Sequence, residues 1–120
     1  MAVTNLNDAL TQNLRILAEW RVNHQTWTVD GSDVIVVPVE GAPVQYVNLS
    51  GTSNAIRLPL AAKNGTMFIV TNNASDANVL LVTDDAGSPV TIATLAADTG
   101  GLFMKKDAAY VCLLESAAIA

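Results

Sequence analysis

The sequence predicts an all-β fold: a jelly-roll-like antiparallel sandwich of eight or nine short strands with a short N-terminal helix. Three observations support this fold class. Apolar residues recur three or four positions apart only near the N-terminus, from Leu6 to about Val22. From Thr26 onward they recur at alternate positions. Clusters of Gly, Asn, Asp and Pro separate these runs at intervals of about 8–12 residues, which is typical of a sandwich or barrel.

The first unit, residues 1–24, is expected to be an N-terminal arm with an amphipathic helix. Thr4 or Asn5 is a suitable N-cap, and Asp8 lies in the first turn, where the helix dipole favours an acidic side chain. The helix is too short for a long coiled coil, because its apolar positions cover barely two heptads. These positions form one stripe: Leu6, Leu10, Leu14, Leu17 and Trp20.

The second unit, residues 25–120, is expected to be the β-sandwich domain. Turn sequences such as Asp30-Gly31-Ser32-Asp33 separate its strands. No helix-length segment interrupts the strands, so parallel βαβ units are not expected. The predicted strands are Thr26–Asp30, Val34–Val39, Val44–Leu49, Ala55–Leu58, Thr66–Asn72, Val79–Thr83, Val90–Leu95, Gly101–Lys105 and Tyr110–Leu114.

Two of these strands are apolar on both faces. Pro59 ends the strand before the first of them because it lacks an N–H, and Asn64-Gly65 turns the chain into Met67-Phe68-Ile69-Val70. The second contains Val79-Leu80-Leu81-Val82. One face of a sandwich strand meets the core, so the other face needs a second partner, and a neighbouring subunit is the simplest one. The residues predicted to form this subunit interface are Met67, Ile69, Leu80 and Val82.

Composition also favours assembly and excludes several partners. Charged residues make up 14% of the chain, against about 25% in an average soluble domain. The net charge of −5 disfavours nucleic-acid binding, which needs a basic face. No apolar run approaches the roughly 20 residues that span a bilayer, and the N-terminus lacks the basic-then-apolar pattern of a signal peptide. Neither nucleic acid nor a membrane is therefore expected as a partner.

The sequence contains no catalytic or metal-binding constellation that we can identify. His24 is the only histidine, so a His-based metal cluster cannot form and a Ser-His-Asp triad would have to use it. Asp84-Asp85 could be a carboxylate pair for calcium or acid–base chemistry, but a hairpin turn is favoured because Ser88-Pro89 follows. Cys112 lies in an apolar run, which is more typical of a buried thiol than of a reactive one. We expect no enzyme activity, no cofactor and no metal.

The order of apolar strands and turn residues along the chain resembles that of the β-domains of bacteriophage virions. These domains occur in tail-fibre and tail-spike modules and in trimeric capsid decoration (cement) proteins. The resemblance covers roughly residues 54–114. The residues that carry it are Ile56-Arg57-Leu58-Pro59, Gly65-Thr66-Met67-Phe68-Ile69-Val70-Thr71-Asn72, Val79-Leu80-Leu81-Val82, Thr91-Ile92-Ala93-Thr94-Leu95 and Tyr110-Val111-Cys112-Leu113-Leu114.

The resemblance implies a homotrimer without catalytic activity. The favoured hypothesis is a decoration protein on the outer surface of a phage capsid, bound to the major capsid protein. The alternative is a receptor- or carbohydrate-binding knob of a tail or head fibre. A fibre generally carries a long shaft ahead of the knob, whereas only an amphipathic segment precedes the strands here. The residues expected at capsid or subunit contacts are Leu10, Leu14, Leu17, Trp20 and Trp27, the last of which could instead be an exposed platform for a sugar.

Overall fold

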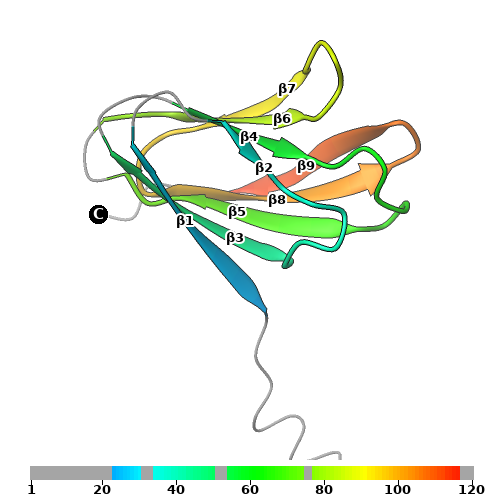
Figure 1. Cartoon of the computed structure of the whole chain (residues 1–120), viewed down its shortest axis with the longest axis horizontal. Helices are drawn as coiled ribbons and strands as arrows, with labels where there is room; N and C mark the ends of the chain where they lie inside the picture. Colours follow the sequence, from blue (N-terminus) through cyan, green and yellow to red (C-terminus); the bar gives the residue numbers. More distant parts are fainter. Residues whose placement is uncertain (1–22, 31–33, 51–53, 75–76, 117–120) are drawn as a thin grey trace, which may run out of the picture.

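The computed structural model describes residues 23–30, 34–50, 54–74 and 77–116. Within these ranges the chain forms nine β-strands and no helix, arranged as two layered sheets (Figure 1). The predicted helix, with Leu10, Leu14, Leu17 and Trp20, lies outside the described residues. The strands are β1 (His24–Asp30), β2 (Ile35–Val36), β3 (Val44–Ser50), β4 (Asn54–Leu58), β5 (Met67–Asn72), β6 (Leu80–Asp84), β7 (Thr91–Leu95), β8 (Thr99–Lys106) and β9 (Ala109–Glu115).

Each of the nine predicted strands is confirmed, with one large change in length. Val34–Val39 was expected to be continuous, but β2 covers only Ile35 and Val36. Pro38 has no N–H to donate to a ladder, and Val39 and Glu40 already lie in a turn that Gly41 closes by donating its N–H to the Pro38 carbonyl at 2.8 Å. The turn at Asn64-Gly65 is also present, and Gly65 adopts a φ of 87°, which glycine tolerates best.

The expectation of a purely antiparallel, jelly-roll-like sandwich is wrong, because both sheets are mixed. The five-stranded sheet has the order β1-β3-β5-β8-β9 and the four-stranded sheet the order β2-β4-β6-β7. The pairs β1–β3, β3–β5, β2–β4 and β4–β6 are parallel. Only β5–β8, β6–β7 and β8–β9 are antiparallel.

The parallel pairs arise because successive strands alternate between the sheets. Strands β1, β3 and β5 belong to one sheet, whereas β2, β4 and β6 belong to the other. Each turn therefore reverses the chain toward the opposite layer, and two turns bring it back beside its starting strand in the same direction. A strand of the opposite sheet thus serves as the crossover that a helix provides in a βαβ unit. Turn residues alone do not reveal which sheet the next strand joins.

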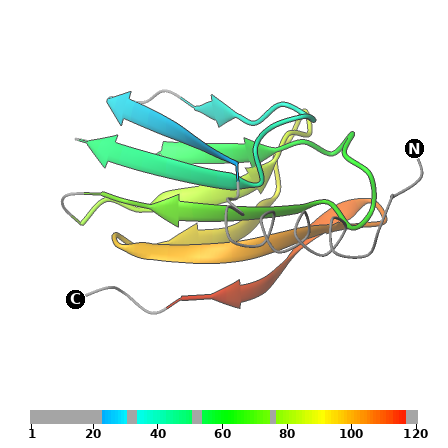
Figure 2. The same ribbon diagram turned by 90° about the horizontal axis from the view of Figure 1, so that it is seen from below.

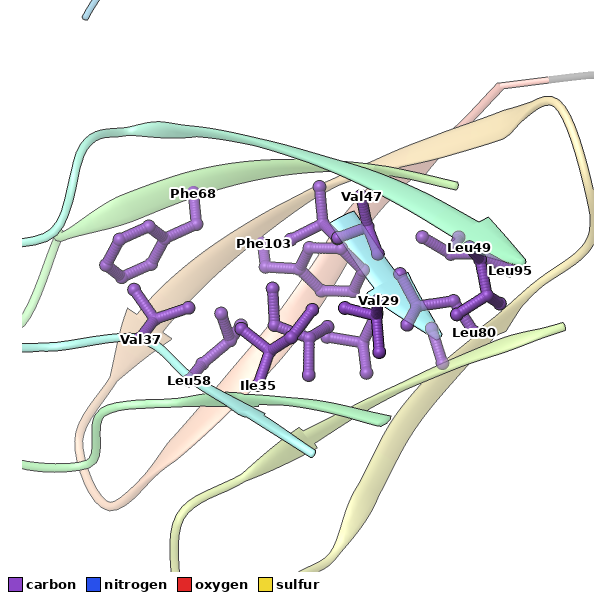
Figure 3. Close-up of a cluster of buried hydrophobic side chains, with 14 of the residues drawn as sticks. Val29, Ile35, Val37, Val47, Leu49, Leu58, Phe68, Leu80, Leu95 and Phe103 are labelled. Atoms are coloured by element: carbon purple, nitrogen blue, oxygen red, sulfur yellow. The ribbon is translucent and has the colours of Figure 1, made fainter. Parts of the chain in front are cut away.

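Apolar side chains from both sheets fill the space between the layers. Phe68 on β5 and Phe103 on β8 are directly opposite each other in the ladder, and both are fully buried. Figure 3 shows their rings between the two layers, among aliphatic side chains from β1, β3, β4, β6 and β7. The aliphatic residues of this core include Val29, Ile35, Val47, Leu49, Ile56, Leu58, Val70, Leu80, Val82 and Leu95.

Two buried polar side chains connect segments that are distant in sequence. The Tyr110 hydroxyl on β9 donates a hydrogen bond to the Pro59 carbonyl, just beyond β4, at 2.7 Å. Burial, with a smaller contribution from Asp85, raises the pKa of Tyr110 to about 12. Asn72 on β5 donates from Nδ2 to the Leu95 carbonyl at 2.9 Å, and its Oδ1 accepts from the Ala74 N–H. Both side chains therefore link the two sheets through hydrogen bonds.

Candidate functional site

The most distinctive surface of the chain is the outer face of the five-stranded sheet. Figure 2, viewed from below the molecule, shows these strands in order from β1 (blue) to β9 (red). Side chains alternate along each strand, so those that do not enter the core point outward. We use the name outer face for one set of these outward side chains: Tyr46, Met67, Ile69, Leu102, Met104, Val111 and Leu114.

Ladder register places these side chains in rows across the strands. Met67 pairs with Met104, which pairs with Val111. Ile69 pairs with Leu102, which pairs with Leu114. Directly opposed residues have Cβ atoms about 4.5–5.5 Å apart, so each row is a continuous apolar band. No Asp, Glu, Lys or Arg interrupts either band in this part of the described chain.

Strand β5 shows most clearly that this sheet is apolar on both sides. Met67 and Ile69 are 48% and 42% exposed, whereas Phe68 and Val70 are 1% and 0% exposed. The described structure therefore places two of the four predicted interface residues together on the outer face. An exposed apolar surface on rigid strands is typical of an interaction site.

The other two predicted interface residues have a different place. Leu80 and Val82 on β6 are both fully buried in the core between the sheets. They have no exposed surface to offer a neighbour in the folded chain. The residue between them, Leu81, points outward and is 37% exposed. In Val79-Leu80-Leu81-Val82 the prediction assigned the inward-facing residues to the interface, because the four side chains are too similar to show which of them face the core.

Trp27 on β1 is held in place from within the domain. Its Nε1–H donates to Oε1 of the fully buried Gln45 at 2.6 Å, and Gln45 Nε2 donates to the Ala42 carbonyl at 2.7 Å. The ring is partly buried against the core. Trp27 is therefore a structural anchor whose N–H is occupied, which does not favour the role of a freely exposed sugar platform.

A second, smaller apolar surface lies beside Trp27, where the edge strands of the two sheets meet. A shallow groove of about 320 Å³ is lined by Trp27, Val29, Val34, Ile35 and Val36. Val34 and Val36 are 44% and 52% exposed on the outward side of β2. This surface, which we call the edge groove, spans β1 of one sheet and β2 of the other and does not include Met67 or Ile69.

Several polar residues considered in the sequence have structural partners. Asp84 Oδ1 accepts from the Val90 N–H at 3.0 Å, and Asp85 Oδ1 accepts from the Leu60 N–H at 2.9 Å, as expected of turn residues. Burial first, then Glu115, raises the pKa of the Cys112 thiol, so little thiolate forms near neutral pH. His24 begins β1 and stacks edge-on against Tyr46, with ring centroids 5.6 Å apart. Among the described residues no group of three or more His, Cys, Asp or Glu side chains could hold a metal ion.

Sequence reasoning missed part of the outer face. Leu102, Met104 and Val111 were placed in strands but not assigned to an interface. Their alternation with the buried residues Phe103, Lys105 and Tyr110 is visible in the sequence. That alternation becomes informative only when the pairing of β5 with β8, and of β8 with β9, is known.

No protein-family model matches this chain, and no curated protein matches its sequence. Across the described residues, no helix has the length and apolarity needed to cross a membrane.

Proposed function

We propose that this chain is a non-enzymatic structural protein of a bacteriophage particle: a homotrimeric decoration (cement) protein on the outer surface of the capsid. Its partners are other copies of itself and the major capsid protein. The observation that carries the proposal is the outer face, where Met67 and Ile69 are exposed directly behind the buried pair Phe68 and Val70. A sheet with apolar side chains on both faces needs a cover on each.

The low charge of the chain supports assembly as its function. With 14% charged residues and 51% hydrophobic residues, a single copy has little polar surface with which to cover its exterior. Exposed apolar patches larger than a few hundred Å² are rare on monomeric soluble proteins. Packing against further copies of the chain removes such a patch from water.

Two separate apolar surfaces suit a protein that makes two kinds of contact. The outer face, with Met67 and Ile69, is the proposed contact between subunits. The edge groove, with Trp27, Val34 and Val36, is the proposed contact with the capsid. Both are built on strands anchored in one core, so their relative geometry is fixed. A rigid body with two fixed contact surfaces can hold neighbouring capsid subunits together.

The mechanism of such a protein is mass action. A ligand that binds only the assembled lattice stabilises it by RT ln(1 + [L]/Kd), which is about 2.7 kcal/mol at a concentration 100 times Kd. A trimer multiplies the effect, because engagement of one subunit raises the effective concentration of the other two at the lattice. No chemical step is needed.

Cosedimentation with phage capsids that lack the protein tests this function. The unmodified chain is expected to sediment with the capsids and to raise the temperature at which they disassemble. Val36→Asp is expected to abolish cosedimentation while preserving the trimer, whereas Thr94→Asp, at an exposed position on β7 at the opposite edge of the same sheet, is the matched control that retains binding. Failure of the unmodified trimer to bind the capsid, or specific binding to a glycan array, would contradict the proposal.

A further inference from the structure

The proposed trimer imposes a requirement on the outer face. When a flat patch packs against the same patch of a second copy, the contact is isologous and closes as a two-fold dimer. A ring of three requires a heterologous contact, in which the patch meets a different surface of the next copy. The outer face of one copy must therefore be covered by something other than the outer face of another.

The sequence contains a segment that is expected to form an apolar surface distinct from the outer face. Residues 6–22, outside the described ranges, have the spacing of an amphipathic helix with the stripe Leu6, Leu10, Leu14, Leu17 and Trp20. At 100° per residue, Asp8, Arg15 and Glu19 fall on the opposite side of such a helix. A helix of this length is marginal in water without a partner for its stripe. The helix that the sequence predicts and the outer face of the sheet would thus each present an apolar surface to a partner.

The dimensions of the two surfaces agree. Seventeen residues of helix are about 25 Å long at 1.5 Å per residue. The four strands β3, β5, β8 and β9 have centres that span about 14–15 Å at 4.7–4.9 Å per step, to which the widths of the outermost side chains add. One helix laid across these strands can therefore lie along the apolar bands of the outer face. A helix laid on a sheet is a standard way to bury a second apolar sheet face.

The segment also starts from a suitable place. It joins β1 at His24, and β1 is the edge strand of the sheet that bears the outer face. The His24 ring contacts Tyr46, which belongs to that face, so the chain enters the domain at its border. From an exposed edge, an N-terminal arm can extend to an adjacent copy.

We infer that residues 6–22 of one copy lie across the outer face of the next copy and thereby close the ring of three. The inference rests on the proposed trimer and names the segment that occupies its interface. The stripe provides the distinct surface that a heterologous contact needs. Docking of the segment on its own domain would instead cover the outer face without linking any copies.

Disulfide trapping tests the pairing. In a Cys112→Ser background, Leu14→Cys and Met67→Cys are placed in separate chains and co-expressed, one of them with an affinity tag that gives the mixed dimer its own mass. Oxidation is expected to produce that mixed disulfide dimer. Leu14→Cys with Leu81→Cys, whose position is similarly exposed on the opposite sheet, is the matched control and is expected to give little of it.

The alternatives have different signatures. If the double variant Leu14→Cys/Met67→Cys forms a disulfide within one chain while the mixed pair forms none, the segment covers its own domain and the inference is wrong. Absence of both disulfides overturns it as well. Sedimentation of the Cys112→Ser parent distinguishes failure of the proposed trimer from failure of the proposed exchange of residues 6–22. A monomeric parent contradicts the trimer. A trimeric parent without the mixed disulfide contradicts only the exchange.

Discussion

Replacing Ile69 with Asp is expected to dissociate the trimer and leave the sandwich folded. Ile69 is 42% exposed at the centre of the outer face, and its ladder partner on β8 is Leu102. In an isolated chain the new carboxylate would remain hydrated. Its cost to folding is then limited to strand propensity, a scale that spans about 1 kcal/mol.

The cost to assembly is larger and follows from the same exposure. Full burial of an Ile side chain contributes about 1.5–3 kcal/mol, so covering the 42% that is exposed contributes about 1 kcal/mol. A polar group buried at the contact without a partner adds about 1–3 kcal/mol, and more when it is charged. The sum of about 2–4 kcal/mol corresponds to roughly 30- to 700-fold weaker association at each subunit contact.

Sedimentation velocity over a micromolar concentration range measures this effect. The unmodified chain and the control Val36→Asp, whose position is 52% exposed on the other sheet, are expected to remain trimeric. Ile69→Asp is expected to sediment as a monomer with a far-ultraviolet circular dichroism spectrum like that of the unmodified chain. A trimer of unchanged affinity for Ile69→Asp would refute the assignment of this face to subunit contact.

Three further predictions concern the core, the sheet-to-sheet link and the N-terminal segment. Leu80→Ala is expected to lower the free energy of unfolding by about 2–5 kcal/mol because Leu80 is fully buried; a loss below about 1 kcal/mol in chemical denaturation would contradict that burial. Tyr110→Phe is expected to cost about 0.5–1.5 kcal/mol because it removes one of two donors to the Pro59 carbonyl, which still accepts from the Ala62 N–H. The raised pKa of Tyr110, about 12, means that the folded state holds its proton more tightly than the unfolded state, with pKa near 10. Stability should therefore be full below pH 10 and decline toward pH 12, and a denaturation series in which Tyr110→Phe keeps the same decline would rule this out. Removal of residues 1–22 is expected to leave a folded β-domain that sediments as a monomer, since the described core begins at Val29; a trimer of the shortened chain would exclude a role for that segment in assembly.

The positions of the strands could be predicted from the sequence because apolar alternation and turn residues are local signals. Pro59 and Gly65 bracket the connection before β5 as expected, and β5 itself differs from the prediction by one residue. The direction of pairing was not predictable in the same way. The connection from β4 to β5, residues 59–66, leads to the opposite sheet, whereas the one from β6 to β7, residues 85–90, stays in the same sheet, although both contain Pro and Gly.

The candidate site could be predicted only in part, for a similar reason. Met67 and Ile69 alternate with Phe68 and Val70, and because all four side chains are apolar the sequence does not state which pair faces the core. The residues predicted for the interface include Met67 and Ile69, which are exposed, and Leu80, which is buried. Residues from β8 and β9 join the outer face through ladder register, which depends on contacts between distant parts of the chain.

The central claim is that other copies of the chain cover the outer face. Sedimentation equilibrium of the unmodified chain over a micromolar concentration range tests it most directly, because the fitted mass does not depend on molecular shape. A subunit has a mass of 12.6 kDa, and we predict a single species with three times that mass. A stable species of 12.6 kDa across the whole range would contradict the account.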